Sequence, residues 1–139
     1  MSPFPRPDVP AARPLEPPGV WVELLSARRD VPCPGLFLDR DGVVIEDRGY
    51  IRDPAEIALR PGIGSLIAQA RQKGWAVAVV TNQSGIARGL FGWDDFAAVQ
   101  AEMMRQLAAQ DVAVDAVAAC PFHPDFTAAY DDEAAQWRK

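Results

Sequence analysis

Two aspartates stand two residues apart where an apolar run of the chain ends. The run 36–38 leads into Asp39 and Asp41, and Gly42 follows directly. Side chains at i and i+2 of a strand lie on the same face, so both carboxylates can face one pocket. A carboxylate nucleophile beside a second carboxylate that handles protons suits group transfer, and the same oxygens suit Mg²⁺. An ordinary acidic surface turn explains this pair, taken alone, equally well.

A second apolar run, 77–80, ends in small polar residues followed by glycines. Thr81 and Ser84 offer hydroxyls, Asn82 offers an amide, and the loop offers backbone N–H groups, all of which bind phosphoryl oxygens well. Arg88 could reach a second phosphate, or it could be a solvated loop arginine. The alternative for the whole motif is a plain strand-to-loop turn, but two strand ends with complementary chemistry favour a shared site.

Alternating strand and helix patterns would bring the two motifs together. We expect strands at 36–38, 76–80 and 116–119, the last ending at Cys120, with helices between them. The β-α-β-α-β order predicts a Rossmann-like three-layer α/β sandwich with a parallel sheet, and both motifs then lie at the carboxyl ends of strands. The unbroken apolar run 76–80 predicts a strand that is covered on both faces. The inner stripe of the second helix should be Phe96, Val99, Met103 and Leu107.

The two motifs together resemble those of the haloacid dehalogenase (HAD) superfamily. The segments FLDRDGVV and VVTNQSGIARG are similar to the capless branch that holds heptose 1,7-bisphosphate phosphatases, histidinol-phosphatases and polynucleotide 3′-phosphatases. The segments EDRGYI and LRPGIGSLIAQARQKGW fit the heptose bisphosphate phosphatases best. The resemblance covers residues 35–124 and extends to the last two residues only weakly.

The resemblance implies Mg²⁺-dependent hydrolysis of a small sugar phosphate, of the heptose 1,7-bisphosphate type, through an aspartyl-phosphate. Histidinol phosphate is the alternative substrate. Asp39 would be the nucleophile and Asp41 the general acid and base. The Asp39 carboxylate and the Asp41 backbone carbonyl would bind the metal. Thr81 would bind a phosphoryl oxygen, with Asn82 and Ser84 beside it.

The C-terminal part of the chain departs from the family's pattern. The family's Arg-Lys-Pro lysine is matched only by Arg138 and Lys139 at the end of the chain, and no Gly-Asp-x-x-x-Asp loop follows. The acidic cluster 131–133 lacks the glycine and is a poor substitute. We therefore expect a C-terminally truncated phosphatase domain with an incomplete sheet, impaired as an isolated chain. Two alternatives stay open: an inactive chain that binds phosphate or a protein partner, and a split enzyme completed by another polypeptide.

The family's structural zinc site is also incomplete in this sequence. Cys120 and His123 are present, but Ala135 and Trp137 stand where two further cysteines would be needed. One thiol and one imidazole do not close a tetrahedral site, so we predict no zinc.

Composition and length limit the remaining possibilities. The chain has 139 residues, enough for one domain, and its net charge of −5 argues against a nucleic-acid partner. We divide it into a Pro-rich N-terminal extension, 1–34, extended or disordered, and a HAD-like domain, 35–139. Residues 21–25 are expected to form a short element that packs back on the domain. The sequence predicts a cytoplasmic protein with no membrane partner, and it leaves the oligomeric state open.

Overall fold

Three parallel strands form the centre of the fold, as the alternating pattern predicts. The computed structural model describes residues 19–27 and 29–125, and these strands are β2 (Gly35–Leu38), β3 (Ala76–Asn82) and β4 (Ala116–Cys120). β3 lies between β2 and β4 and pairs parallel with both. The predicted α/β class is confirmed, and the three strands end where the sequence places the two motifs and Cys120.

A fourth strand, β1 (Trp21–Leu24), pairs antiparallel with β4 and gives the order β1-β4-β3-β2. The sheet is therefore mixed, whereas the sequence predicts a purely parallel one. The short element expected at 21–25 packs on the domain by joining its sheet. Residues 1–18, the first part of the predicted extension, lie outside the described residues.

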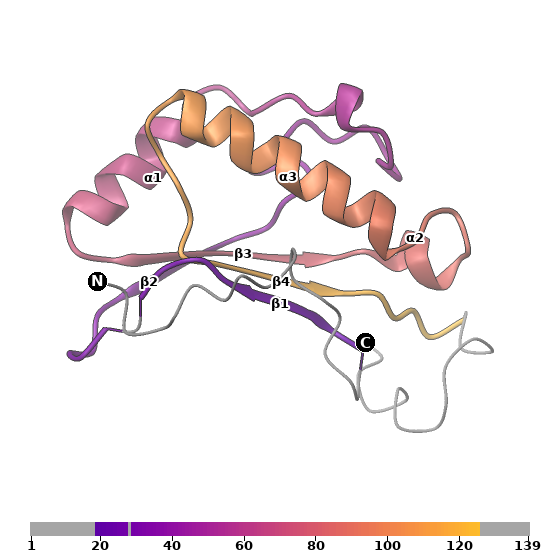
Figure 1. The fold of residues 1–139 in the computed structure, drawn as a ribbon, viewed down its shortest axis with the longest axis horizontal. Helices are drawn as coiled ribbons and strands as arrows, with labels where there is room; N and C mark the ends of the chain where they lie inside the picture. Colours follow the sequence, from indigo (N-terminus) through magenta and orange to yellow (C-terminus); the bar gives the residue numbers. More distant parts are fainter. Residues whose placement is uncertain (1–18, 28, 126–139) are drawn as a thin grey trace.

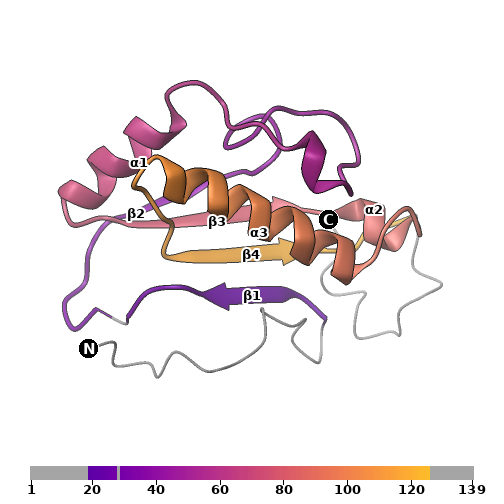
Figure 2. The same cartoon turned by 45° about the horizontal axis from the view of Figure 1, so that its top comes forward.

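Both long helices lie on one face of the sheet (Figures 1 and 2). α1 (Ile63–Gln72) connects β2 to β3, and α3 (Trp93–Ala109) connects β3 to β4. Two shorter elements, the 3₁₀ helix η1 (Pro54–Glu56) and α2 (Ser84–Ala87), precede them. Both connections step across the sheet in the same direction, β2 to β3 to β4. Crossovers of one hand therefore place both helices on the same face.

The core lies between the sheet and α3. The predicted inner stripe of this helix is confirmed, because Phe96, Val99, Met103 and Leu107 are each fully buried. Trp21 from β1 joins them and is 2% exposed. Its ring centroid lies 4.9 Å from that of Phe96, which ties the N-terminal strand to the helix.

The other face of the sheet is apolar and, among the described residues, no helix covers it. Residues of all four strands alternate onto this face, and their larger side chains stay exposed: Val22, Leu24, Phe37 and Val80. The register aligns Val22, Ala118 and Val80 in one row across the sheet. The prediction that 76–80 is covered on both faces is therefore not met by the described part of the chain. Those residues provide two of the three expected layers.

One buried acid, Asp115, organises the amino-terminal end of β4. Its Oδ2 accepts a hydrogen bond from the Val77 N–H at 2.7 Å. Its Oδ1 lies 3.8 Å from Arg29 Nη2 and 3.6 Å from Arg71 Nη2. We call Asp115, Arg29 and Arg71 the Asp115 cluster. The cluster joins the segment after β1, helix α1 and two strands at this end of the sheet.

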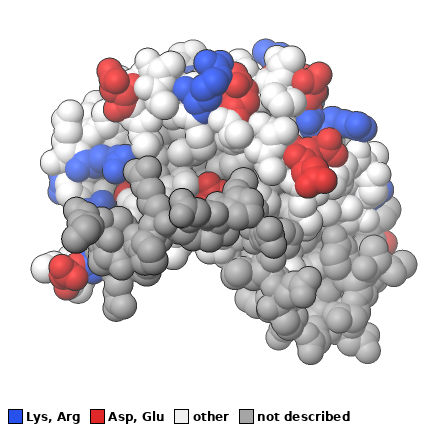
Figure 3. Space-filling view, in the orientation of Figure 1, with Lys and Arg blue, Asp and Glu red and all other residues white. Residues whose placement is uncertain are grey.

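The surface in the view of Figure 3 carries acidic and basic side chains interspersed over the helical layer. In this view the described residues form no purely basic patch of the kind typical of nucleic-acid binders. Within residues 19–27 and 29–125, no helix is both long enough and apolar enough to span a membrane.

Candidate active site

The candidate site is built at the carboxyl ends of β2 and β3. Leu38, the last residue of β2, pairs with Val79 of β3, so the residues after β2 lie beside the end of β3. The chain then turns tightly, with the Arg40 carbonyl accepting from the N–H groups of Val44 at 2.9 Å and Ile45 at 3.0 Å. Gly42 has a φ of 83° in this turn, a conformation that a β-carbon would strain. The sequence Asp39 to Gly42 therefore forms a compact loop beyond the strand.

Asp39 is exposed at the point where β2 ends. Its Oδ1 accepts a hydrogen bond from the Arg40 backbone N–H at 2.7 Å. This contact fixes the carboxylate against the turn while the side chain stays open to solvent. An accessible, oriented carboxylate can act as a nucleophile and as a ligand for a hard cation.

Asp41 and Thr81 are joined through the side chain of Gln83. Gln83 Nε2 donates to Asp41 Oδ2 at 2.9 Å and to Thr81 Oγ1 at 2.9 Å. Arg40 completes the arrangement: its Nη2 donates to Asp41 Oδ1 at 3.0 Å and to Gln83 Oε1 at 3.2 Å. We call these four residues, Arg40, Asp41, Thr81 and Gln83, the Asp41 ring. The two sequence motifs therefore meet by direct hydrogen bonds.

Arg40 and Gln83 were not among the residues singled out from the sequence. Both are almost fully buried, with 1% and 5% of their surface exposed. A signal for Gln83 was available, because it stands at i+2 from Thr81 and can share its face. No comparable signal exists for Arg40, since an arginine between two acids normally faces solvent.

The other predicted phosphate-binding residues of the described chain, Asn82, Ser84 and Arg88, are not members of this four-residue ring. Asn82 is exposed, and strand alternation places it on the opposite face from Thr81. Ser84 begins the four-residue helix α2, and Arg88 is its C-cap residue. Arg88 Nη2 lies 3.3 Å from Nε2 of His123, and its guanidinium lies 5.7 Å from the centre of the Tyr50 ring.

Several predicted residues cannot be placed. Arg138, Lys139 and the acidic cluster 131–133 lie outside the described residues. Within the described ranges, no group of three or more His, Cys, Asp or Glu side chains could hold a metal ion. Cys120 is partly buried at the end of β4.

The residues at the strand end nevertheless fit a magnesium ion that is shared with a substrate. Mg²⁺ commonly takes one or two protein carboxylates and completes its shell with water and phosphate oxygens. The exposed Asp39 carboxylate meets this requirement. Asp41 fits less well through its side chain, because Arg40 and Gln83 occupy both of its oxygens.

Comparison with known proteins relates the chain to phosphatases. No family model matches it. A D-glycero-β-D-manno-heptose-1,7-bisphosphate 7-phosphatase of Mesorhizobium japonicum is 52% identical over 111 residues, covering 79% of this chain and 51% of the relative. The enzyme of the same name from Yersinia pestis is 38% identical over 106 residues, covering 76% and 56%. The chain thus spans about half the length of these relatives.

Solved structures show the same relationship in three dimensions. A HAD-like phosphatase from Mesorhizobium loti, 48% identical, has a TM-score of 0.78, covering 88% of this chain and 57% of that protein. D,D-heptose 1,7-bisphosphate phosphatase of Bordetella bronchiseptica, solved with magnesium and phosphate, is 40% identical with a TM-score of 0.63, covering 71% and 56%. The chain is therefore a homologue of the heptose 1,7-bisphosphate phosphatases and has the fold of the HAD-like phosphatases.

Proposed function

We propose that the protein hydrolyses a phosphate monoester of a small sugar, of the heptose 1,7-bisphosphate type. The observation that carries the proposal is the Asp41 ring, which joins Asp41 to Thr81 directly beyond the exposed Asp39. The relatives named above act on a heptose bisphosphate, and a magnesium- and phosphate-bound neighbour shares the fold.

The reaction follows from the three side chains. An Asp39 carboxylate oxygen attacks phosphorus as the bond to the sugar oxygen breaks, giving an aspartyl-phosphate. Asp41 gives its proton to the departing sugar oxygen. Water then attacks phosphorus, Asp41 takes a proton from it, and phosphate leaves Asp39 with its carboxylate restored. Thr81 donates its hydroxyl hydrogen to a phosphoryl oxygen.

A bound Mg²⁺ would be held by Asp39 and, following the family resemblance, by the Asp41 backbone carbonyl. It would neutralise part of the charge on the phosphoryl group. We predict no zinc in the protein. The segment that resembles the family's zinc site has only one thiol and one imidazole, those of Cys120 and His123.

Turnover of two substrates tests the proposal. The chain is assayed with D-glycero-β-D-manno-heptose 1,7-bisphosphate and with histidinol phosphate, each with Mg²⁺ and with a chelator. We expect release of phosphate from the heptose substrate to be slow, in line with the impairment expected for the isolated chain, to depend on Mg²⁺ and to be abolished in Asp39→Asn. Asp111→Asn is the matched control, because Asp111 is an exposed aspartate with a φ of 59° that asparagine tolerates.

The other outcomes decide between the alternatives. Faster release from histidinol phosphate would assign the other substrate. Binding of inorganic phosphate without turnover, lost in Asp39→Asn, would favour a binding protein. If the chain showed no turnover and did not bind inorganic phosphate, the proposal would be refuted.

A further inference from the structure

We propose that Gln83 is a positioning residue, which orients the Asp41 carboxylate and sets the direction of the Thr81 hydroxyl. The inference rests on the proposed function, because it assigns Gln83 a role in the same reaction. Gln83 need not contact the substrate. It would act through the two residues to which its amide donates hydrogen bonds.

The Gln83 amide can take only one orientation in this ring. Its nitrogen donates both hydrogens, one to Asp41 and one to Thr81, and its oxygen accepts from Arg40. Rotating the amide by half a turn would set its oxygen against a carboxylate and its nitrogen against a guanidinium. Both contacts would be repulsive, so the hydrogen-bond pattern defines the orientation.

This orientation fixes the carboxylate of Asp41 at both oxygens. Arg40 donates to Oδ1 from Nη2 at 3.0 Å and from Nε at 3.3 Å, while Gln83 donates to Oδ2 at 2.9 Å. Without Gln83, the carboxylate would keep one anchored oxygen and could rotate about it. Proton transfer depends on geometry before acidity, so such rotation would slow it.

The same amide determines what the Thr81 hydroxyl can do. Thr81 Oγ1 accepts the Gln83 hydrogen, so the single hydroxyl hydrogen must point elsewhere. Its acceptor within the described part of the chain is the Asn82 carbonyl at 3.5 Å, the outer limit for a hydrogen bond. A phosphoryl oxygen would be a better acceptor, so Gln83 prepares Thr81 to donate to phosphate.

Arg40 anchors the ring to the protein core. Its side chain is 1% exposed, and its guanidinium lies 5.7 Å from the centre of the Phe96 ring on α3. The ring is therefore held by a buried group rather than by a mobile surface side chain. A buried, fully bonded amide between two reacting groups is the arrangement expected of a positioning residue.

The first test separates positioning from general structural support by the leaving group. Gln83→Leu is compared with the parent on an alkyl sugar phosphate and on p-nitrophenyl phosphate, using kcat/KM, which reports phosphoryl transfer to Asp39. An alkoxide needs a proton from Asp41 and a nitrophenolate does not. We expect a loss of about 10²-fold on the alkyl substrate. On the aryl substrate, where only the weakened Thr81 contact counts, the loss should be about tenfold or less.

Gln100→Leu is the matched control. Gln100 is also a buried glutamine, 3% exposed, but its amide makes no hydrogen bond within the described residues. It should leave both kcat/KM values close to those of the parent. Equal losses on both substrates in Gln83→Leu would overturn the proposal. If the leucine variant does not fold, Gln83→Glu keeps the side-chain length but sets a carboxylate against Asp41, and the same selective loss is expected.

A second test does not depend on turnover. Hydrogen exchange of the Arg40 Nε–H and the dissociation constant for inorganic phosphate are measured by NMR without metal. In Gln83→Leu we expect faster exchange and phosphate binding weakened about tenfold, and in Gln100→Leu neither change. Unchanged exchange and unchanged binding would refute the positioning role. A parent chain that shows no turnover but gives these NMR results would refute the proposed function alone.

Discussion

The two ends of the sheet each carry an aspartate paired with arginine, and the two pairs are built in opposite ways. In the Asp115 cluster the acid is buried, with 9% of its side chain exposed, and Arg29 and Arg71 are each 36% exposed. In the Asp41 ring the arginine is buried, at 1%, and the aspartate is 22% exposed. The carboxylate of Asp115, at the amino ends of the strands, is buried, whereas that of Asp41, at their carboxyl ends, is partly open to solvent.

This difference indicates a structural role for Asp115 and a role in the reaction for Asp41. Asp115 accepts a backbone hydrogen bond from β3 and lies within ion-pair distance of Arg29 and Arg71. Asp41 is held by buried donors but keeps a surface that a substrate can approach. In open α/β sheets, ligands bind outside the carboxyl ends of the strands, in agreement with this division.

The largest effect on stability should come from replacing Asp41, the acidic partner of the buried Arg40. Asp41→Asn would leave Arg40 as a buried cation without its acidic partner, which costs about 3 kcal/mol in the free energy of unfolding. Urea denaturation followed by circular dichroism measures this loss. Adding Arg40→Met should restore most of the stability without restoring turnover. If Asp41→Asn alone were as stable as the parent, the burial of Arg40 would not depend on its pairing with Asp41.

The Asp115 cluster should respond differently. Asp115→Ala would remove the acceptor of the Val77 N–H, while Arg29 and Arg71 could turn to water, so we expect a loss of about 2 kcal/mol in unfolding free energy. The affinity of the folded protein for inorganic phosphate should not change. Weaker phosphate binding at full folding would show that the two ends of the sheet are coupled.

A smaller effect should link the core to the ring. Phe96→Leu would cost about 1 kcal/mol of stability through imperfect repacking and would remove the aromatic face beside Arg40. Met103→Leu, on the same buried stripe, is the matched control. Both variants should lose similar stability in urea, but only Phe96→Leu should speed hydrogen exchange at Arg40. Equal exchange in the two variants would contradict the anchoring role of Phe96.

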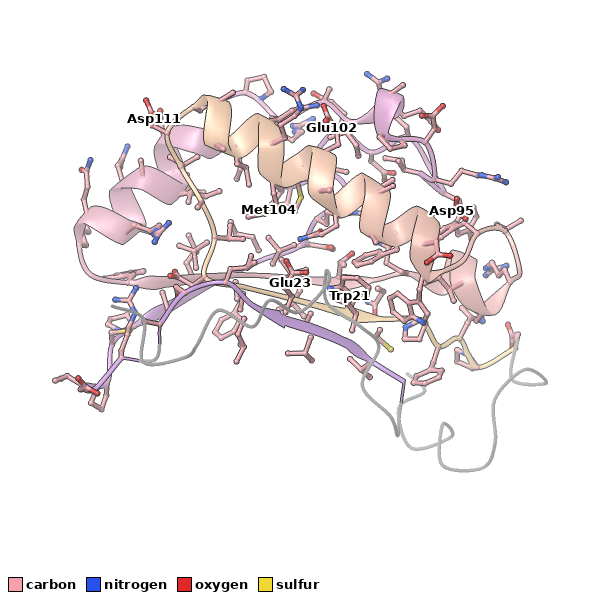
Figure 4. All side chains as sticks on the ribbon, viewed as in Figure 1. Trp21, Glu23, Asp95, Glu102, Met104 and Asp111 are labelled. Atoms are coloured by element: carbon pink, nitrogen blue, oxygen red, sulfur yellow. The ribbon has the colours of Figure 1, made fainter. Side chains whose placement is uncertain are left out.

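The smallest effect depends on pH and concerns neither end of the sheet. Figure 4 shows Glu23 on the helical side of β1, where burial raises the pKa of its carboxyl above the ordinary 4.5. The folded state then holds this proton more readily than the unfolded state, so stability from Glu23 is present below pH 4.5 and is lost as pH rises through the folded pKa. Glu23→Gln should therefore raise the urea midpoint at neutral pH and leave it unchanged below pH 4.5.

Glu102 serves as the control for that measurement, because its pKa is shifted in the opposite direction. Hydrogen bonds from Arg105 and Gln106 lower the pKa of this partly exposed carboxyl to about 2. Its contribution is present above pH 4.5 and is lost as pH falls toward 2. Glu102→Gln should lower the midpoint slightly at neutral pH. Shifts of the same sign in both variants would contradict these assignments.

Patterns among neighbouring residues of the sequence predicted the helices, because their positions depend mainly on those residues. The stripe from Phe96 to Leu107 repeats with the period of a helix, and Gly74, with a φ of 79°, follows the end of α1, where glycine commonly ends a helix. The antiparallel pairing of β1 was not predictable, because Trp21 is buried by Trp93 and Phe96, which are distant in the sequence. Pairing of that kind leaves no periodic signal near Trp21.

The candidate site could be predicted only in part for a similar reason. Asp39, Asp41 and Thr81 can be proposed from the sequence, because their chemical types and strand-end positions are readable one motif at a time. The ring itself depends on contacts between the motifs, between Gln83 and Asp41 and between Arg40 and Gln83. Burial of an arginine by a distant glutamine is a property of the folded chain, not of either motif.

Trapping the phosphorylated protein tests directly whether Asp39 is the nucleophile. The chain is mixed with heptose 1,7-bisphosphate and Mg²⁺, quenched in acid, digested and mapped by mass spectrometry. We expect a phosphoryl group on the peptide that contains Asp39, acid-stable and lost on treatment with hydroxylamine. Asp39→Asn should remove it, and Asp111→Asn should not. Phosphoryl transfer to another residue, or turnover without any phosphoryl group on Asp39, would show that Asp39 is not the nucleophile.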